Sequence, residues 1–406
     1  MPNVQPAQHQ EPGTTHGELA DLLEARRDEI LSILIEVSTY RAAVYEFESA
    51  LATLRGAETE IAAHRPPRLE RLAVFMPSNV LFYSYVLYGL VPAAYVDEVV
   101  VRPASHVRET ARKLHQLVGP LHQFRIVFHD VTQRQFVEEL VPTAGAVVFT
   151  GAYQNAEKIR SKLRGDQVMF FLGSGINPIV VTEHADILSA VEGIVEIRLL
   201  NSGQDCLGPD AIWVHRERAE EFLRVLSARL RSLRFGDYDD PQSDYGRIHY
   251  PGILRNVAEF LGRHQALIRY GGRIHFAHHH VEPTVVFWAD ARSMELPEFF
   301  SPIFNVRSYD SEREVVEELN DRQYGERAMG ATVFGRSKVI IDALTRRHTV
   351  TVDETLLAID DGNAPLGGRG PMANYIAVNG RIYPEPILLS KGLSEHAHKA
   401  GQEQVA

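Results

Sequence analysis

The hydrophobic positions of the first 65 residues repeat with the spacing of helices. Apolar residues share one helical face at Leu19, Leu22, Leu23, Ile30 and Leu34. This stretch is expected to be helical, because an amphipathic helix repeats its apolar positions every three to four residues. Thr15, followed by Glu18, has the pattern of a capping box and predicts the N-terminus of this helix. A second helix is expected over about residues 42–63.

After Pro66 and Pro67 the pattern changes to short β-rich runs that alternate with helical ones. Strands are expected at residues 72–76, 99–101, 124–128 and 147–150, with helices between them. This alternation predicts a parallel sheet with crossover helices. The resulting half is Rossmann-like, although the G-x-G-x-x-G fingerprint of many dinucleotide-binding proteins appears nowhere in it.

A second α/β unit follows. Its pattern predicts strands at residues 179–182 and 211–215 and helices at about 187–199 and 222–233. The chain ends, up to about Thr14 and beyond about Ser394, are polar and are expected to be frayed. The sequence therefore predicts an α/β protein with two principal domains.

Composition and charge narrow the class of protein. A hydrophobic content of 45% and a charged content of 23% are typical of a globular protein, and the net charge of -11 argues against a nucleic-acid partner. No run reaches the roughly 18 to 20 apolar residues of a membrane span, and the polar N-terminus lacks the pattern of a secretion signal. The single cysteine excludes an internal disulfide and fits a reducing cytoplasm.

That cysteine is the strongest candidate for chemistry. Cys206 ends the run Asn201-Ser202-Gly203-Gln204-Asp205-Cys206, which lies between a predicted helix and a predicted strand. A turn at this place can present the thiol at a cleft. Backbone N–H groups around it would lower its pKa and favour a nucleophilic thiolate. On composition alone, a core cysteine without a chemical role is the alternative.

The run 201–206 resembles the N-x-G-Q-x-C nucleophile loop of the aldehyde dehydrogenase superfamily. Other motifs of that family recur in order at Pro77-Ser78-Asn79, Phe149-Thr150-Gly151, Glu282-Pro283-Thr284, Glu298-Phe299-Phe300-Ser301-Pro302, Asn320-Asp321, Tyr324-Gly325 and Pro365-Leu366-Gly367-Gly368. The resemblance covers about residues 19–390. It implies a flexible N-terminus (1–16), a nicotinamide-cofactor domain (17–172), a catalytic domain (173–364) and a C-terminal segment (365–406) that returns to the cofactor domain or to an oligomer interface.

The resemblance also implies the residues of the site. Cys206 would carry a thioester, and Asn79 with the Cys206 N–H would stabilise the oxyanion. Cofactor contacts are implied for Arg102, Ser105, Thr150, Gly151, Leu172, Glu298 and Phe300. Judged on their own, Asn79 and Ser105 could each be a helix N-cap instead, and Glu298 a solvated acid.

One departure from the family changes the predicted chemistry. Phe171 stands where hydrolytic members carry the glutamate that activates water, and phenylalanine cannot accept a proton. The run 173–178, G-S-G-I-N-P, resembles the CoA-acylating members, which pass the acyl group to or from a thiol. We therefore expect acyl-thioester chemistry, including its reductive direction. Glu183 is the nearby substitute base if water is the acceptor.

Other departures concern the cofactor and the assembly. Arg102-Pro103-Ala104-Ser105 replaces K-P-S-E, so a carboxylate that would repel a 2'-phosphate is absent and an arginine is available to bind one. NADP or NAD is the expected cofactor. Ala152 and Ala156 replace the usual Ser and Gly, which predicts weaker phosphate anchoring. Residues 66–72 are too few for the family's β-hairpin arm, which makes a homodimer the expected assembly.

Three functions remain open at this point. The first is an acylating oxidoreductase, acting on a small aldehyde and an acyl-thioester of CoA or of a carrier protein. The second is an aldehyde dehydrogenase that yields a carboxylic acid with another base, and the third is a cofactor-binding pseudoenzyme. No metal is expected, because His275, His278, His279 and His280 have no acidic or cysteine partner at ligand spacing.

Overall fold

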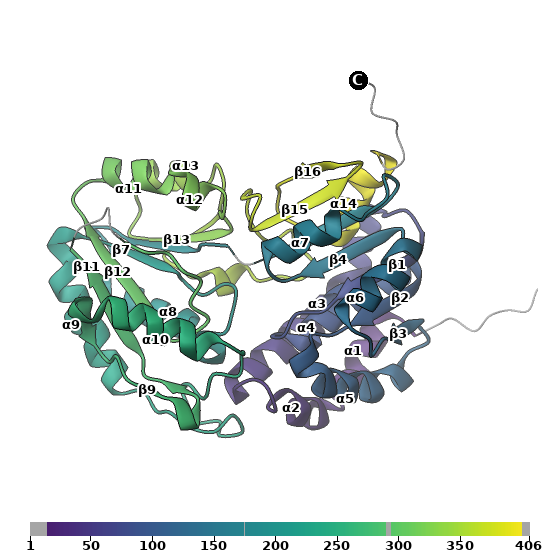
Figure 1. Ribbon diagram of the computed structural model, residues 1–406, viewed down its shortest axis with the longest axis horizontal. Coiled ribbons are helices and arrows are strands. Elements are labelled where there is room, and N and C mark those ends of the chain that lie inside the picture. Colours follow the sequence, from purple (N-terminus) through teal and green to yellow (C-terminus); the bar gives the residue numbers. More distant parts are fainter. Residues whose placement is uncertain (1–13, 174, 290–293, 400–406) are drawn as a thin grey trace, which may run out of the picture.

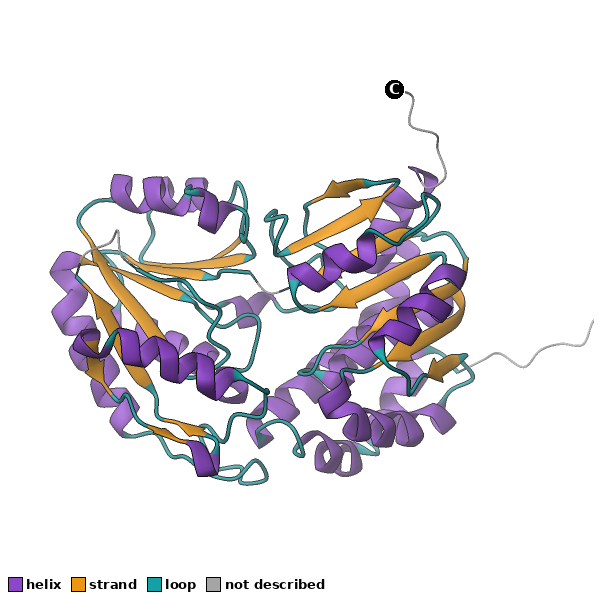
Figure 2. Cartoon of the chain, in the orientation of Figure 1, coloured by secondary structure: helices purple, strands orange, loops and turns teal. Residues whose placement is uncertain are grey.

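The computed structural model describes residues 14–173, 175–289 and 294–399, and it confirms the α/β class. Two seven-stranded sheets lie side by side, each with helices against its faces (Figure 1). Figure 2 shows the strands of both sheets enclosed by helices. The helices in the described ranges are all too short or too polar to cross a bilayer.

The first half of the chain builds most of one sheet and the helices around it. These elements are α1 (His16–Glu24), α2 (Arg27–Leu34), α3 (Tyr40–His64), β1 (Leu69–Phe75), α4 (Leu81–Tyr85), β2 (Val96–Arg102), α5 (Arg108–Val118), β3 (Ile126–Phe128), α6 (Gln133–Gln135), β4 (Ala146–Thr150), α7 (Tyr153–Arg160) and β5 (Val168–Leu172). Strands β3, β2, β1, β4 and β5 run parallel in that order. Parallel strands end at one edge, so the segments after β1, β4 and β5 lie close together.

The second sheet is built by the middle of the chain. Its elements, with their helices, are β6 (Pro178–Val181), α8 (Ile187–Leu199), β7 (Ala211–His215), α9 (Arg216–Arg231), α10 (Ile253–Arg263), β8 (Ile268–Tyr270), β11 (Thr284–Trp288), β12 (Ile303–Tyr309), α11 (Glu312–Leu319), α12 (Arg322–Gly325), β13 (Gly330–Phe334), α13 (Lys338–Leu344) and β14 (Thr349–Val352). A separate hairpin is formed by β9 (Ile274–His275) and β10 (His280–Val281). The strand order is β14-β13-β6-β7-β12-β11-β8, with only β8 antiparallel.

The C-terminal segment joins the first sheet. Strand β15 (Asn374–Val378) pairs antiparallel with β5, and β16 (Arg381–Tyr383) closes that edge. Helix α14 (Leu389–His396) then packs against α3 and β5. The chain thus crosses between the sheets twice, and the segments that cross bring residues from both halves to one place.

The predicted N-terminal helix begins where expected, but it is two helices and not one. Thr15 forms the expected capping box with Glu18. The helix then breaks at Ala25 and Arg26 instead of continuing. Within α1 the buried face is formed by His16, Leu19, Ala20 and Leu23, so Leu22 points outward and is 44% exposed, while the other apolar positions of the predicted stripe are buried. The helix expected at 42–63 is confirmed as α3.

Candidate active site

Cys206 lies on a loop with an unusual backbone. After α8, Asn201, Ser202 and Gly203 adopt positive φ angles of 46°, 60° and 82° in succession. Only glycine fits the third position, because a Cβ there would lie 2.5 Å from the backbone of Ser301. Non-glycine residues at such angles cost free energy, and they persist where the surrounding structure fixes them. The turn therefore carries the chain tightly into Cys206.

Two buried side chains donate hydrogen bonds to the backbone carbonyl groups of this loop. Asn177 Nδ2 donates to the carbonyl oxygens of Cys206 at 2.7 Å and Gly208 at 3.2 Å. Arg198, 1% exposed, donates to the carbonyl oxygens of Pro209 at 3.0 Å and Gly203 at 3.3 Å. Neither residue is assigned a role from the sequence. The one available signal was an arginine inside the apolar pattern of the predicted helix at 187–199.

Asn79 is fixed beside the same loop. Its Nδ2 donates to the carbonyl oxygen of Gln204 at 3.4 Å, and its Oδ1 accepts from the Tyr250 hydroxyl at 3.1 Å. The Gln204 side chain accepts in turn from the backbone N–H of Tyr250 at 3.0 Å. The N-cap interpretation of Asn79 is wrong, because Val80 occupies that position, with a φ of 45° and no side-chain cap.

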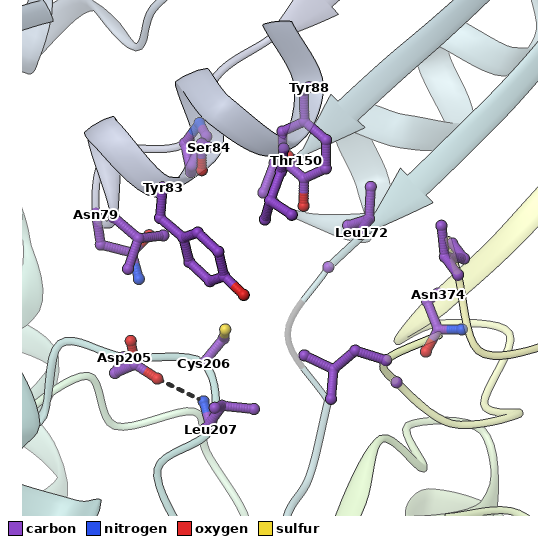
Figure 3. Close-up of a pocket in the computed structure, with 18 of the residues that line it drawn as sticks. Asn79, Tyr83, Ser84, Tyr88, Thr150, Leu172, Asp205, Cys206, Leu207 and Asn374 are labelled. Carbon is purple, nitrogen blue, oxygen red and sulfur yellow. Dashed lines mark hydrogen bonds between the residues drawn. The ribbon is translucent and has the colours of Figure 1, made fainter. Parts of the chain in front are cut away.

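A cavity of about 490 Å³ opens between the two sheets at this point. Seven of the residues predicted from sequence line it: Asn79, Thr150, Gly151, Leu172, Cys206, Glu298 and Phe300. In Figure 3 the Asn79 and Tyr83 side chains, from the segment after β1, point toward the Cys206 sulfur, with Thr150 and Leu172 beyond them. The structure thus brings together residues that lie more than 200 positions apart.

Two predicted residues do not line the cavity. Arg102 is buried, and its guanidinium donates to the Ser105 hydroxyl at 3.0 Å and to the Val131 carbonyl at 3.3 Å. The N-cap interpretation of Ser105 is wrong, because Ala104 occupies the cap of the turn that follows. Among residues 102–105, Ala104 is the one that lines the cavity.

Comparison with known proteins identifies the family. The sequence model of the aldehyde dehydrogenase family matches residues 72–369. The chain belongs to the aldehyde dehydrogenase family.

Individual members of the aldehyde dehydrogenase family are only distantly similar. The 4,4'-diapolycopene-4,4'-dial dehydrogenase of Cytobacillus firmus is 27% identical over 310 residues, which cover 74% of this chain and 66% of that protein. The 2-hydroxymuconic semialdehyde dehydrogenase of Pseudomonas sp. (strain CF600) is 30% identical over 257 residues, covering 59% and 52%. The chain therefore spans between about half and two thirds of these curated relatives.

The fold matches solved structures of the family over almost the whole chain. Succinic semialdehyde dehydrogenase from Streptococcus pyogenes, solved in complex with NADP+, superposes with a TM-score of 0.79. The match covers 94% of this chain and 87% of that one at 16% identity. The predicted aldehyde dehydrogenase-like fold is therefore confirmed.

The cavity wall after β4 fits the phosphates of a nicotinamide dinucleotide. The Thr150 hydroxyl is buried and has no hydrogen-bond partner among the described residues. Helix α7 begins at Tyr153, and its cap, Ala152, provides no side-chain hydrogen bond. The first backbone N–H groups of a helix have no partners within it, and they are suited to bind phosphate.

The electrostatics around the thiol differ from the sequence-based expectation. Burial raises the pKa of Cys206 well above its ordinary value, and the charges of Asp205, Asp360 and Glu298 raise it further. The prediction of a lowered pKa is therefore wrong, because desolvation and neighbouring acids outweigh the backbone N–H groups. A raised pKa favours the protonated thiol at neutral pH.

Glu298 is exposed, and its side chain lines the cavity. Desolvation raises the pKa of Glu298 to about 8, and the nearby Asp210 charge acts in the same direction, against the opposing effect of Arg327. A carboxyl of this kind changes its charge readily when a ligand binds beside it.

The position of the missing family base is part of the core. Phe171 is fully buried, with its ring 4.9 Å from that of Tyr375 and 6.4 Å from that of Phe149. Glu183, considered as a substitute, is exposed near His184 and does not line the cavity.

An acid that sequence analysis missed does line the cavity. Asp360 accepts from the hydroxyls of Tyr45 at 2.9 Å and Tyr83 at 3.3 Å, and burial raises the pKa of its carboxyl to about 6. It lies in the segment that crosses back to the first sheet, between strand β14 and the motif Pro365-Leu366-Gly367-Gly368, and belongs to no motif recognised in the sequence.

Proposed function

We propose that this protein is an NAD(P)-dependent oxidoreductase that interconverts an aldehyde and an acyl-thioester through a thioester on Cys206. The observation that carries this proposal is the shared cavity, which is lined by the Cys206 thiol, Asn79, Thr150 and Glu298, with the Asn79 amide bonded to the nucleophile loop. A nucleophile, an oxyanion donor and a phosphate-binding wall at one cavity are the components that the reaction needs.

The roles of the chain's own groups follow from their positions. The Cys206 sulfur attacks the aldehyde carbon, and its proton leaves to solvent or to a carboxylate of the wall. Asn79 Nδ2 and the Cys206 N–H donate to the oxygen as it becomes negative. Tyr250 holds Asn79 Oδ1, which keeps the amide nitrogen turned toward the nucleophile loop. When bound, the nicotinamide supplies hydride acceptance or donation at the same carbon.

Two features support a thiol as the acyl acceptor. Phe171 cannot activate water, and the run 173–178 resembles the acylating members of the family. A thiol acceptor attacks the Cys206 thioester, the new carbon–sulfur bond forms as the old one breaks, and the Cys206 sulfur is released. This exchange requires no base at position 171. A CoA or carrier-protein thioester is thus the proposed product or, in reverse, the substrate.

A second candidate is hydrolysis to the carboxylic acid. Asp360 favours it, because a carboxylate with a pKa of about 6 in the cavity wall can accept a proton from water at neutral pH. The two functions differ in the acceptor of the acyl group, which is a thiol in the first and water in the second. Their products therefore distinguish them.

The test is to supply NAD+ or NADP+ with aldehydes in the presence and absence of CoA, and to analyse products by mass spectrometry. The acylating function predicts acyl-CoA and turnover that depends on CoA. Acid formation without CoA would establish the second function instead. Cys206→Ser removes the nucleophile and should lower kcat at least about 1000-fold in either case. If no substrate is turned over while nucleotide binds, the protein is a pseudoenzyme.

We propose NADP or NAD as cofactor and assign Arg102 to discrimination between them. Arg102 lies at the end of β2, two residues before Ala104 of the cavity wall, and its guanidinium can supply a counter-charge for a 2'-phosphate. Arg102→Ala should raise KM for NADP at least about tenfold and leave KM for NAD within about twofold. We further propose that the protein forms a homodimer, because β1 follows α3 after only four residues (65–68), with no hairpin arm between them. We also propose a cytoplasmic location, which fits a chain with a single cysteine.

A further inference from the structure

The cavity extends past Cys206 into the first half of the fold, and the charged groups in its largely apolar wall are all acidic. Among the described residues that line it, the carboxylates are Glu60, Asp205, Glu298, Asp360 and Asp361, and there is no lysine, arginine or histidine. Glu298 is assigned to the cofactor by the proposed function. The others belong to the half that remains for the substrate, so the charge of this half is unbalanced.

Glu60 is the most deeply buried of these acids that has no cation. It is 6% exposed on α3. Its two oxygens accept from the Asn363 amide at 3.3 Å and from the Ser390 hydroxyl, both neutral donors. No ion pair to Glu60 occurs within the described ranges. A buried carboxylate is normally paired with a cation, and this one retains lone pairs for further donors.

Tyr95 provides an independent sign of a ligand at the same place. It lines the cavity and is 6% exposed, and its hydroxyl has no hydrogen-bond partner in the described part of the chain. Burial raises the pKa of Tyr95, and the charge of Glu60 raises it further, so the two groups are neighbours. A buried hydroxyl without a partner is uncommon in a folded protein.

This acidic end is separated from the nucleophile by an apolar stretch. Tyr45, which donates to Asp360 near Cys206, precedes Glu60 on α3 by fifteen residues, or about 22 Å of helix. The wall between these two ends also contains the apolar residues Leu87, Val91 and 387–389. A molecule with its carbonyl at Cys206 would therefore place an aliphatic chain here.

We infer that Glu60 and Tyr95 form a subsite for the ammonium group of an aliphatic amino-aldehyde or amino-acyl substrate. The ammonium would donate to the Glu60 carboxylate and to the Tyr95 oxygen while its carbonyl carbon lies at Cys206. A charge-assisted hydrogen bond in a dry site discriminates strongly against a methyl group, and a terminal carboxylate would be repelled. This inference rests on the proposed function for the position of the carbonyl.

The test uses unreactive probes, so that it does not depend on turnover. Binding of long-chain amino-alcohols, chosen so that their extended lengths bracket the separation between Glu60 and Cys206, to the full-length protein is compared by calorimetry with that of the corresponding plain alcohols. At least one amino-alcohol should bind about tenfold or more tightly than its partner. Glu60→Gln, which keeps the shape, and Tyr95→Phe, which removes only the unpartnered hydroxyl, should each abolish most of this preference. Glu58→Gln, an exposed charge on the same helix, should not change it.

Equal affinity for the two series, or a preference that survives both variants, would overturn the subsite. The outcome of the proposed function is read separately. An amine preference that depends on Glu60 supports the subsite even if no aldehyde is turned over, whereas turnover of plain aldehydes with no amine preference supports the function and refutes the subsite.

Discussion

The side-chain amide of Asn177 donates to the carbonyl oxygen of Cys206 at 2.7 Å. Asn177 immediately precedes β6, and the loop of Cys206 leads into β7, which pairs with β6 in parallel. The nucleophile is thus held by the strand adjacent to its own.

Removal of the Asn177 amide should loosen the nucleophile loop. Asn177→Ala leaves the carbonyls of Cys206 and Gly208 without their buried donor, which should cost about 1–3 kcal/mol of stability. We expect kcat to fall about 10- to 100-fold with a smaller change in KM, since a misplaced nucleophile affects mainly the chemical step. Steady-state kinetics and thermal unfolding measure both. Asn320→Ala, which removes an exposed amide that bonds within α11, should leave kcat unchanged.

Tyr250 should act through Asn79. Tyr250→Phe removes the donor that orients Asn79 Oδ1, and we expect kcat to fall about tenfold. Asn79→Ala should lower kcat about 100-fold or more, because an oxyanion donor is lost. The double variant should match Asn79→Ala alone. Independent, multiplicative losses would mean that Tyr250 has a separate role.

The reactivity of Cys206 should increase steeply with pH. Its raised pKa means that alkylation by iodoacetamide increases about tenfold per pH unit through the neutral range, because only the thiolate reacts. Asp205→Asn removes the nearest negative charge and keeps an oxygen to accept from the Leu207 N–H. This variant should lower the thiol pKa and speed alkylation at a fixed pH. Intact-mass analysis follows the single cysteine, and Asp239→Asn, on the surface, should have no effect. A rate independent of pH would contradict the raised pKa.

Glu46 should make stability depend on pH. Burial raises the pKa of Glu46 from about 4.5 to about 8, although the N–H groups of Phe82 and Tyr83 oppose this rise. In the window between these values the folded protein binds more protons than the unfolded chain, so stability falls as pH rises. The loss should be about 2 kcal/mol between about pH 6 and pH 8.

Glu46→Gln mimics the protonated acid, so it should remove this loss, making the variant the more stable protein at about pH 9. Urea unfolding of both proteins at several pH values measures this difference in the free energy of unfolding. Glu48→Gln, an exposed neighbour, should follow the wild-type curve. A variant that is less stable than wild type at high pH would show that Glu46 is charged in the folded state.

Much of the architecture was readable from the sequence. Hydrophobic runs such as those of β1, β4, β6 and β7 are buried on both faces, and such strands appear as short apolar segments between helical ones. The motif residues Asn79, Thr150, Cys206 and Glu298 were also recognisable, since their local patterns survive in a distant relative. Local signals of this kind depend on neighbours along the chain.

Only the tertiary structure determines the hydrogen-bond partners and the pKa values of those residues. Asn177 and Tyr250 support the nucleophile loop through hydrogen bonds to Cys206 and Asn79, which lie 29 and 171 positions away, and no local pattern predicts these partners. The thiol pKa rises because burial and the charge of Asp360, 154 residues away, act on it together. Desolvation and Coulomb interaction depend on distance in space, which the order of residues does not specify.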